Sequence, residues 1–215
     1  MEALDRYINF NDWLTLICVL ALFLLTFAKK ISPYHFKNFL LLILSDKYIK
    51  THKEDTSKKR VHYTLLAFQG LILPLVIYTF LLKLTYIEST NWFEYIKIFV
   101  YYIAFYGIKF LLEIGTSYLI KENIQISSYI FQKQTYFNYV ACCLFPIILF
   151  VIYSLTINPL IIYIIIILLL FLLLASVILV ITNHRTLFYS KPYYFILYLC
   201  AFEIAPYVLT IYYYN

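Results

Sequence analysis

Six apolar runs, each close to the length that a helix needs to cross a bilayer, constrain this chain more than any other feature. Such a helix takes about 20 apolar residues to span a hydrocarbon core of about 30 Å. Of the 215 residues, 64% are apolar and 13% charged, against about 45–50% and about 25% in soluble domains. The sequence therefore predicts one all-α domain over residues 1–215, a polytopic transmembrane helical bundle. Its spans are expected at Asp12–Ala28, Val61–Leu84, Phe93–Ile120, Tyr136–Ile157, Leu160–Thr182 and Pro192–Tyr213.

Lysine and arginine are distributed unevenly between the two sides of this predicted bundle. Loops that face the cytoplasm carry an excess of these residues. The loops after the first, third and fifth spans hold nearly all of them, whereas the opposite side has Arg6 and Lys83. This asymmetry places Thr51–Arg60 in the cytoplasm and both termini outside it. It also accounts for the net charge of +6, so we expect no nucleic-acid partner. The cytoplasmic cations are Lys29, Lys30, Lys37, Lys47, Lys50, Lys53, Lys58, Lys59, Arg60, Lys121, Lys133, Arg185 and Lys191.

A shorter amphipathic helix is expected between the first two spans, over residues 33–50. Pro33 suits its first turn, and apolar residues recur at helical spacing from Phe36 to Leu44, with His35 and Asp46 among the polar residues largely opposite. Such a helix lies in the membrane interface, and its basic flanks attract anionic lipid headgroups. A docking platform for a membrane-protein partner remains an alternative. The candidate docking residues are Phe36, Leu40, Ile43, Leu44, Lys58, Lys59 and Arg60.

The segment Lys121–Gln134 is more polar than its surroundings. Its glutamines and serines make it too polar for the centre of a bilayer. We expect it to form either a second interfacial stretch or the projecting end of the third span. Nothing in it indicates catalysis.

Ionisable and amide side chains inside the spans form a candidate buried polar cluster of Lys109, Glu113, Glu203 and Gln69. Lys109 and Glu113 are four residues apart and share one helix face. Ionisable residues at this depth are costly and usually face the bundle interior. Three roles remain open: a structural ion pair, a proton or ion pathway, and a ligand or headgroup site. The depths of Lys109 and Glu203 overlap, which predicts that the third and last spans are neighbours.

Reaction motifs and cofactor signatures are absent from the sequence. Cys18, Cys142, Cys143 and Cys200 lie inside apolar runs without metal-binding spacing. There is no Walker lysine, GxSxG or HExxH motif. We therefore predict no metal, no cofactor and no catalytic residue.

The string Leu197–Pro206, LYLCAFEIAP, resembles the terminal helix of an uncharacterised family of multispanning inner-membrane proteins of Bacteroidota, classed as a domain of unknown function. Asn11-Asp12-Trp13 at the start of the first span agrees with that resemblance. The resemblance implies the inner membrane of a didermous bacterium, and hence periplasmic termini. It implies no activity, cofactor or catalytic residue.

Three functional hypotheses follow. The first, which the sequence favours, is a non-enzymatic accessory or assembly subunit of an envelope complex. The second is a small proton- or ion-coupled transporter that uses Lys109, Glu113 and Glu203. The third is a membrane enzyme that acts on lipid-linked substrates, for which only His62 and His184 lie near the required interface.

Overall fold

In the computed structural model, the described part of the chain comprises residues 12–42, 48, 56–84, 91–119, 123–154 and 159–183. This part contains six helices and no strand, so the all-α prediction is confirmed there. Four of the helices contain stretches long and apolar enough to cross a membrane: Asp12–Ile31, Thr56–Lys83, Tyr129–Tyr153 and Ile161–Val180. The helices are α1 (Asp12–Ile31), α2 (Pro33–Leu40), α4 (Thr56–Lys83), α5 (Trp92–Leu119), α6 (Asn123–Tyr153) and α7 (Pro159–Asn183).

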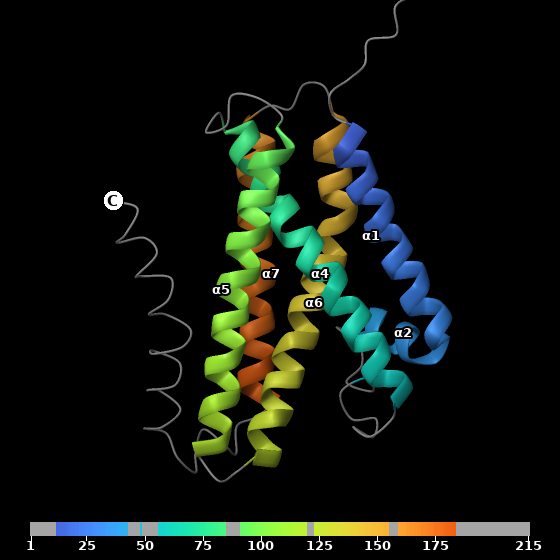
Figure 1. The fold of residues 1–215 in the computed structure, drawn as a ribbon, viewed down its shortest axis with the longest axis vertical. Coiled ribbons are helices and arrows are strands. Elements are labelled where there is room, and N and C mark those ends of the chain that lie inside the picture. Colours follow the sequence, from blue (N-terminus) through green and yellow to red (C-terminus); the bar gives the residue numbers. More distant parts are fainter. Residues whose placement is uncertain are drawn as a thin grey trace, which may run out of the picture.

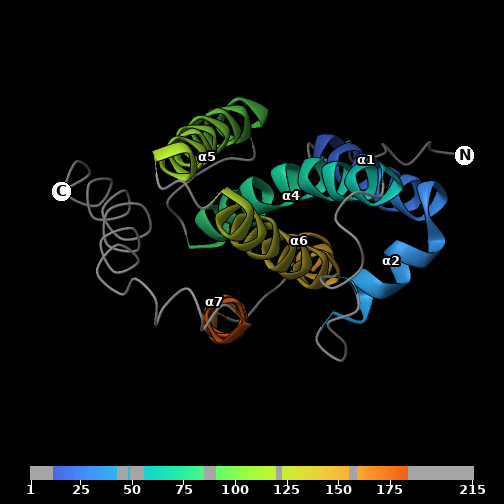
Figure 2. The same cartoon turned by 90° about the horizontal axis from the view of Figure 1, so that it is seen from below.

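Two helices, α4 and α6, form the centre of the bundle and cross one another (Figure 1). α1 packs against α4, α7 packs against α6, and α5 contacts both central helices. Seen along the bundle, α5 and α7 lie on opposite sides of α6 (Figure 2). The same view shows α7 end-on and α2 lengthwise, so α2 lies across the direction of α7. The predicted last span, Pro192–Tyr213, lies outside the described residues.

Buried side chains of the bundle form two apolar clusters. The larger joins α1, α4 and α6 along their length and includes Cys18, Phe68 and Leu144. At one of its ends the Trp13 ring packs 5.3 Å from that of Tyr78. By contrast, α7 exposes most of its apolar side chains. In its most apolar stretch, 17% of the residues are buried inside the protein. Such a surface is suited to lipid, which makes this a membrane protein.

Basic residues gather at one end of the bundle, which we call the basic end. Lys29 and Lys30 lie in the last turn of α1, and Lys37 lies in α2. Lys58, Lys59 and Arg60 occupy the first turns of α4, which begins at the same end of the bundle (Figure 1). The opposite end carries Lys83, in the last turn of α4.

The helix expected over residues 33–50 is interrupted in the structure. Ser32 caps α2, accepting a hydrogen bond from the His35 backbone N–H at 3.5 Å, and the helix ends at Leu40. A turn follows because Leu42 enters the second buried cluster beside Phe39. His35, expected on the polar face, is buried, and Leu40 is exposed. Ile43 and Leu44 lie outside the described residues.

Of the two expectations for Lys121–Gln134, the projecting end of the third span is wrong from residue 123 onward. These residues form the first turns of α6 and are not the end of the preceding helix. Gln132 and Gln134 are buried between helices. The polarity that excludes a residue from lipid does not exclude it from a bundle interior, where other polar side chains can bind it.

Candidate functional site

Five polar side chains from three helices bind one another in the interior of the bundle, and we call them the glutamine network. At its centre, the Gln134 Nε2 donates to Gln69 Oε1 at 2.6 Å and to Asn138 Oδ1 at 3.3 Å. The Tyr106 hydroxyl donates to Gln134 Oε1. Gln69 Nε2 donates in turn to the Tyr102 hydroxyl at 3.3 Å. The network therefore joins α4, α5 and α6.

Helical spacing explains how each helix contributes to this network. Gln134 and Asn138 are four residues apart on α6, and Tyr102 and Tyr106 are four apart on α5, so each pair shares one face. The two tyrosine rings are stacked, with centroids 5.7 Å apart. Gln69, Gln134 and Asn138 are all buried. Because an unpaired amide is costly away from water, these hydrogen bonds hold the three helices in one register.

A cavity beside the network is lined by two lysines. It lies between α5 and α6 and is small, with a volume of about 30 Å³. Lys109 on α5 is 8% exposed and faces this space together with Lys133 of α6. We call it the two-lysine cavity; Tyr106, Phe110, Ile130, Gln134 and Phe137 complete its lining.

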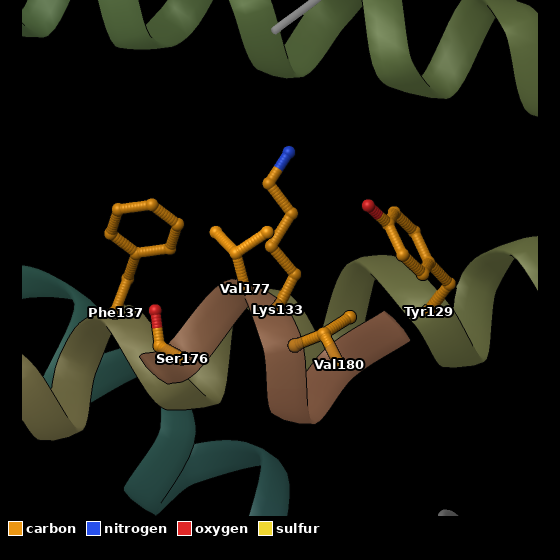
Figure 3. Close-up of a pocket in the computed structure, with 6 residues that line it drawn as sticks. All are labelled: Tyr129, Lys133, Phe137, Ser176, Val177 and Val180. Carbon is orange, nitrogen blue, oxygen red and sulfur yellow. The ribbon is translucent and has the colours of Figure 1, made fainter. Parts of the chain in front are cut away.

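A second, smaller hollow of about 10 Å³ adjoins this cavity on the side of α7. Lys133 and Phe137 line both spaces. Figure 3 shows the Lys133 side chain rising from α6 with its amine directed away from Ser176 and Val177 on α7. Lys133 therefore lies at the middle of a surface that runs from α5 across α6 to α7.

The members of the predicted polar cluster have different positions. Gln69 belongs to the glutamine network, and Lys109 is buried at the two-lysine cavity. The Glu113 side chain and the whole of Glu203 lie outside what the structure describes. A joint role for these four residues stays a prediction. Lys133, Gln134 and the two tyrosines were not predicted as site residues, although the i,i+4 spacing of Gln134 and Asn138 was a usable signal.

The predicted docking residues of the basic end differ in how far their side chains are exposed. Phe36 is half-buried, and Lys59 and Arg60 are exposed. Lys58 is 1% exposed, because its Nζ lies 5.1 Å from the ring centroids of both Tyr48 and Phe131. Aromatic faces attract an ammonium group at this distance. Tyr48 is itself buried, and its burial raises the pKa of its hydroxyl.

The enzyme hypothesis required a histidine at the interface. His62 is buried inside the protein, with its ring 4.5 Å from that of Phe131, and His184 lies outside the described residues. Within the described part, no three side chains of the histidine, cysteine, aspartate or glutamate type are grouped as metal ligands. Cys18, Cys142 and Cys143 are free thiols there.

A family model described as a domain of unknown function (DUF4271) matches residues 14–214. No curated protein and no solved structure matches the chain.

Proposed function

We propose, from the premise that this chain belongs to the DUF4271 family of unknown function, that it is a non-enzymatic accessory or assembly subunit of an envelope complex. The observation that carries the proposal is the glutamine network. Its polar groups bind one another across α4, α5 and α6, which suits a rigid scaffold. Its partners are a membrane protein and the anionic headgroups of lipids at the basic end.

The proposed protein crosses the bacterial inner membrane six times. α5 has 28 residues, about 42 Å of helix, which is enough to cross. With α1, α4, α6 and α7 it supplies five spans, and Pro192–Tyr213 is the sixth. The positive-inside rule turns the basic end toward the cytoplasm and both termini toward the periplasm. α2, which lies across the direction of α7 (Figure 2), is then the interfacial helix.

Exposed basic side chains are the proposed contact with a partner. Lys59 and Arg60 lie in the first turns of α4 and are exposed. They lie where an acidic cytoplasmic surface of another protein can reach them. The apolar faces of α1 and α7, which the bundle leaves largely uncovered, are suited to contact that partner within the membrane.

Affinity purification from native membranes tests the subunit role. We expect stoichiometric recovery of one complex with the tagged wild-type protein, and loss of the partner from the Lys59→Glu/Arg60→Glu variant. The matched control is Lys97→Glu, which changes a lysine of α5 that is 62% exposed. Recovery of the wild-type protein alone, from membranes extracted under several mild conditions, contradicts the proposal.

A proton- or ion-coupled transporter is the second candidate, and one observation favours it. Lys109 is buried and lines a cavity beside the Tyr106 hydroxyl and Gln134, so an ionisable group lies next to a hydrogen-bonded chain. In this proposal Lys109, Glu113 and Glu203 exchange the proton. Proton flux into liposomes that contain the purified protein, lost in Glu203→Gln, supports the transporter; no flux above that of empty liposomes contradicts it.

A further inference from the structure

We infer that the two-lysine cavity binds water, about two molecules, and that this water joins Lys109 and Lys133 to the glutamine network. The ligand belongs to neither proposed function and is compatible with both. Three properties of the cavity support it: its size, the polar side chains in its lining and their burial.

The size of the cavity suits water and excludes larger ligands. A water molecule requires about 10–15 Å³ of space in a protein interior, and the two-lysine cavity has about 30 Å³. A phosphate group or an organic substrate is larger than two water molecules, so neither fits the cavity. The adjoining hollow of about 10 Å³ lies at the lower limit for one water molecule.

The lining supplies the hydrogen bonds that a buried water needs, which number about two to four. Lys109 and Tyr106 of α5, and Lys133 and Gln134 of α6, all line the cavity. The Lys133 amine is directed away from α7 (Figure 3). An ammonium group donates three hydrogen bonds, and a hydroxyl or carbonyl oxygen can accept two. Each of these groups can therefore bind a water in addition to a protein partner.

The directions of the hydrogen bonds in the glutamine network favour water over a direct extension of the network. The Tyr106 hydroxyl donates its hydrogen to Gln134 Oε1, and Gln134 Nε2 donates to Gln69 and to Asn138. Toward the cavity, Tyr106 and Gln134 can then act as acceptors, whereas a charged lysine can only donate. A water molecule accepts from the lysine and donates to either oxygen, so it connects the two kinds of group.

Burial gives this water a physical role. Lys109 is 8% exposed, and it lies ten residues before the end of α5 at Leu119, about 15 Å along the helix. A buried charge is costly unless it is paired and hydrogen-bonded. Water in the cavity solvates the ammonium group inside the bundle. It also extends the glutamine network from amide groups to an ionisable side chain.

Radiolytic hydroxyl labelling of the full-length protein in liposomes tests for this water. An X-ray pulse converts water to hydroxyl radicals, which oxidise the side chains beside a bound water. Phe137 lines the cavity and is half-buried. Phe99 of α5 is also half-buried but packs against the larger apolar cluster. We expect mass spectrometry to show oxidation of Phe137 severalfold faster than that of Phe99, and equally slow oxidation of both overturns the water site.

Two substitutions test whether the lining holds the water. Lys109→Met keeps a long side chain but removes the ammonium group, so the oxidation of Phe137 should fall severalfold. Lys97→Met makes the same change at a lysine of α5 that is 62% exposed, and it should leave the rate unchanged. Tyr106→Phe removes a second partner of the water and should also lower the rate. An unchanged rate at Phe137 in both Lys109→Met and Tyr106→Phe overturns the assignment.

A third comparison separates bound water from bulk solvent. Phe93, at the start of α5, is 55% exposed and reports oxidation by bulk water. Bulk water that reaches α6 oxidises Phe137 equally in the wild-type protein and in Lys109→Met, which also overturns the water site. Oxidation of Phe99 as fast as that of Phe93 contradicts the proposed span of α5 instead. The comparison of Lys109→Met with Lys97→Met at Phe137 then still decides whether the cavity binds water.

Discussion

Gln134 of α6 donates its side-chain amide to Gln69 of α4 at 2.6 Å, across 65 residues of sequence. Gln134 also accepts from Tyr106 and donates to Asn138. Two residues earlier on the same helix, Gln132 is 1% exposed, and neither atom of its amide has a hydrogen-bond partner within the described structure. The two glutamines are thus both buried but differ in what binds them.

Replacing Gln134 should destabilise the protein. Gln134→Met keeps the shape of the side chain but leaves the Gln69 carbonyl oxygen and the Tyr106 hydroxyl without this partner. A buried polar group left unsatisfied costs about 1–3 kcal/mol. We expect the free energy of unfolding, measured by denaturant titration in detergent micelles, to fall by that amount. An unchanged value would show that water or other side chains replace the amide.

The same substitution at Gln132 should behave differently. Gln132→Met removes an amide that makes no hydrogen bond to the described residues, and it keeps the volume of the side chain. Because volume-conserving core changes usually cost less than about 1.5 kcal/mol and the buried amide is no longer desolvated, we expect stability to be unchanged or higher. The two variants are matched controls for one another. A loss at Gln132 as large as that at Gln134 would reveal an additional partner for Gln132.

The cation–π contacts of Lys58 should contribute to stability at the basic end. Phe131→Leu removes one of the two rings that lie 5.1 Å from the ammonium group. Such a contact is worth about 0.5–2 kcal/mol, and we expect a loss of about 1–2 kcal/mol in the same unfolding measurement. Phe150→Leu is the control, because Phe150 lies on α6 and is 63% exposed.

A double-mutant cycle separates the cation–π contact from simple packing. In a Lys58→Met background the charge is absent, so Phe131→Leu should cost less than it does in the wild-type protein. A coupling energy near zero would show that the Phe131 ring acts through packing alone.

The orientation can be checked by labelling single cysteines with a membrane-impermeant maleimide. In intact cells from which the outer membrane barrier has been removed, Asn91→Cys should react and Lys53→Cys should not. Asn91 immediately precedes α5 and is exposed. After lysis both should react, which verifies that each thiol is accessible. Labelling of Lys53→Cys in intact cells, with Asn91→Cys protected, would reverse the proposed orientation.

Several helices follow directly from local sequence. α7 covers Pro159–Asn183 where the apolar run indicated Leu160–Thr182, and α5 covers Trp92–Leu119 where it indicated Phe93–Ile120. These segments are apolar over most of their length. Inside a bilayer their backbone groups must form hydrogen bonds within the segment, and an α-helix provides these bonds. Prediction was incomplete in the first half of α6, where Gln132 and Gln134 were expected to avoid an apolar interior, yet both are buried and Gln134 binds side chains of α4 and α5.

The candidate site could be predicted only in part for a related reason. Gln69 and Lys109 stand out because polar residues are costly inside apolar segments. Lys133 and Gln134 lie in a stretch whose polarity concealed them. The burial of Lys58 also could not be read from its basic neighbours, because the rings of Tyr48 and Phe131 come from two other parts of the chain.

The sequence by itself determined the class of protein, the position of most helices and the asymmetric distribution of charge. These depend on hydropathy and charge within single segments, which act over one helix length. Only the tertiary structure decided that Gln69, Tyr106 and Gln134 bind one another and that Lys109 and Lys133 line one cavity. These contacts depend on how α4, α5 and α6 cross, and the crossing is set by side-chain packing between helices far apart in the chain.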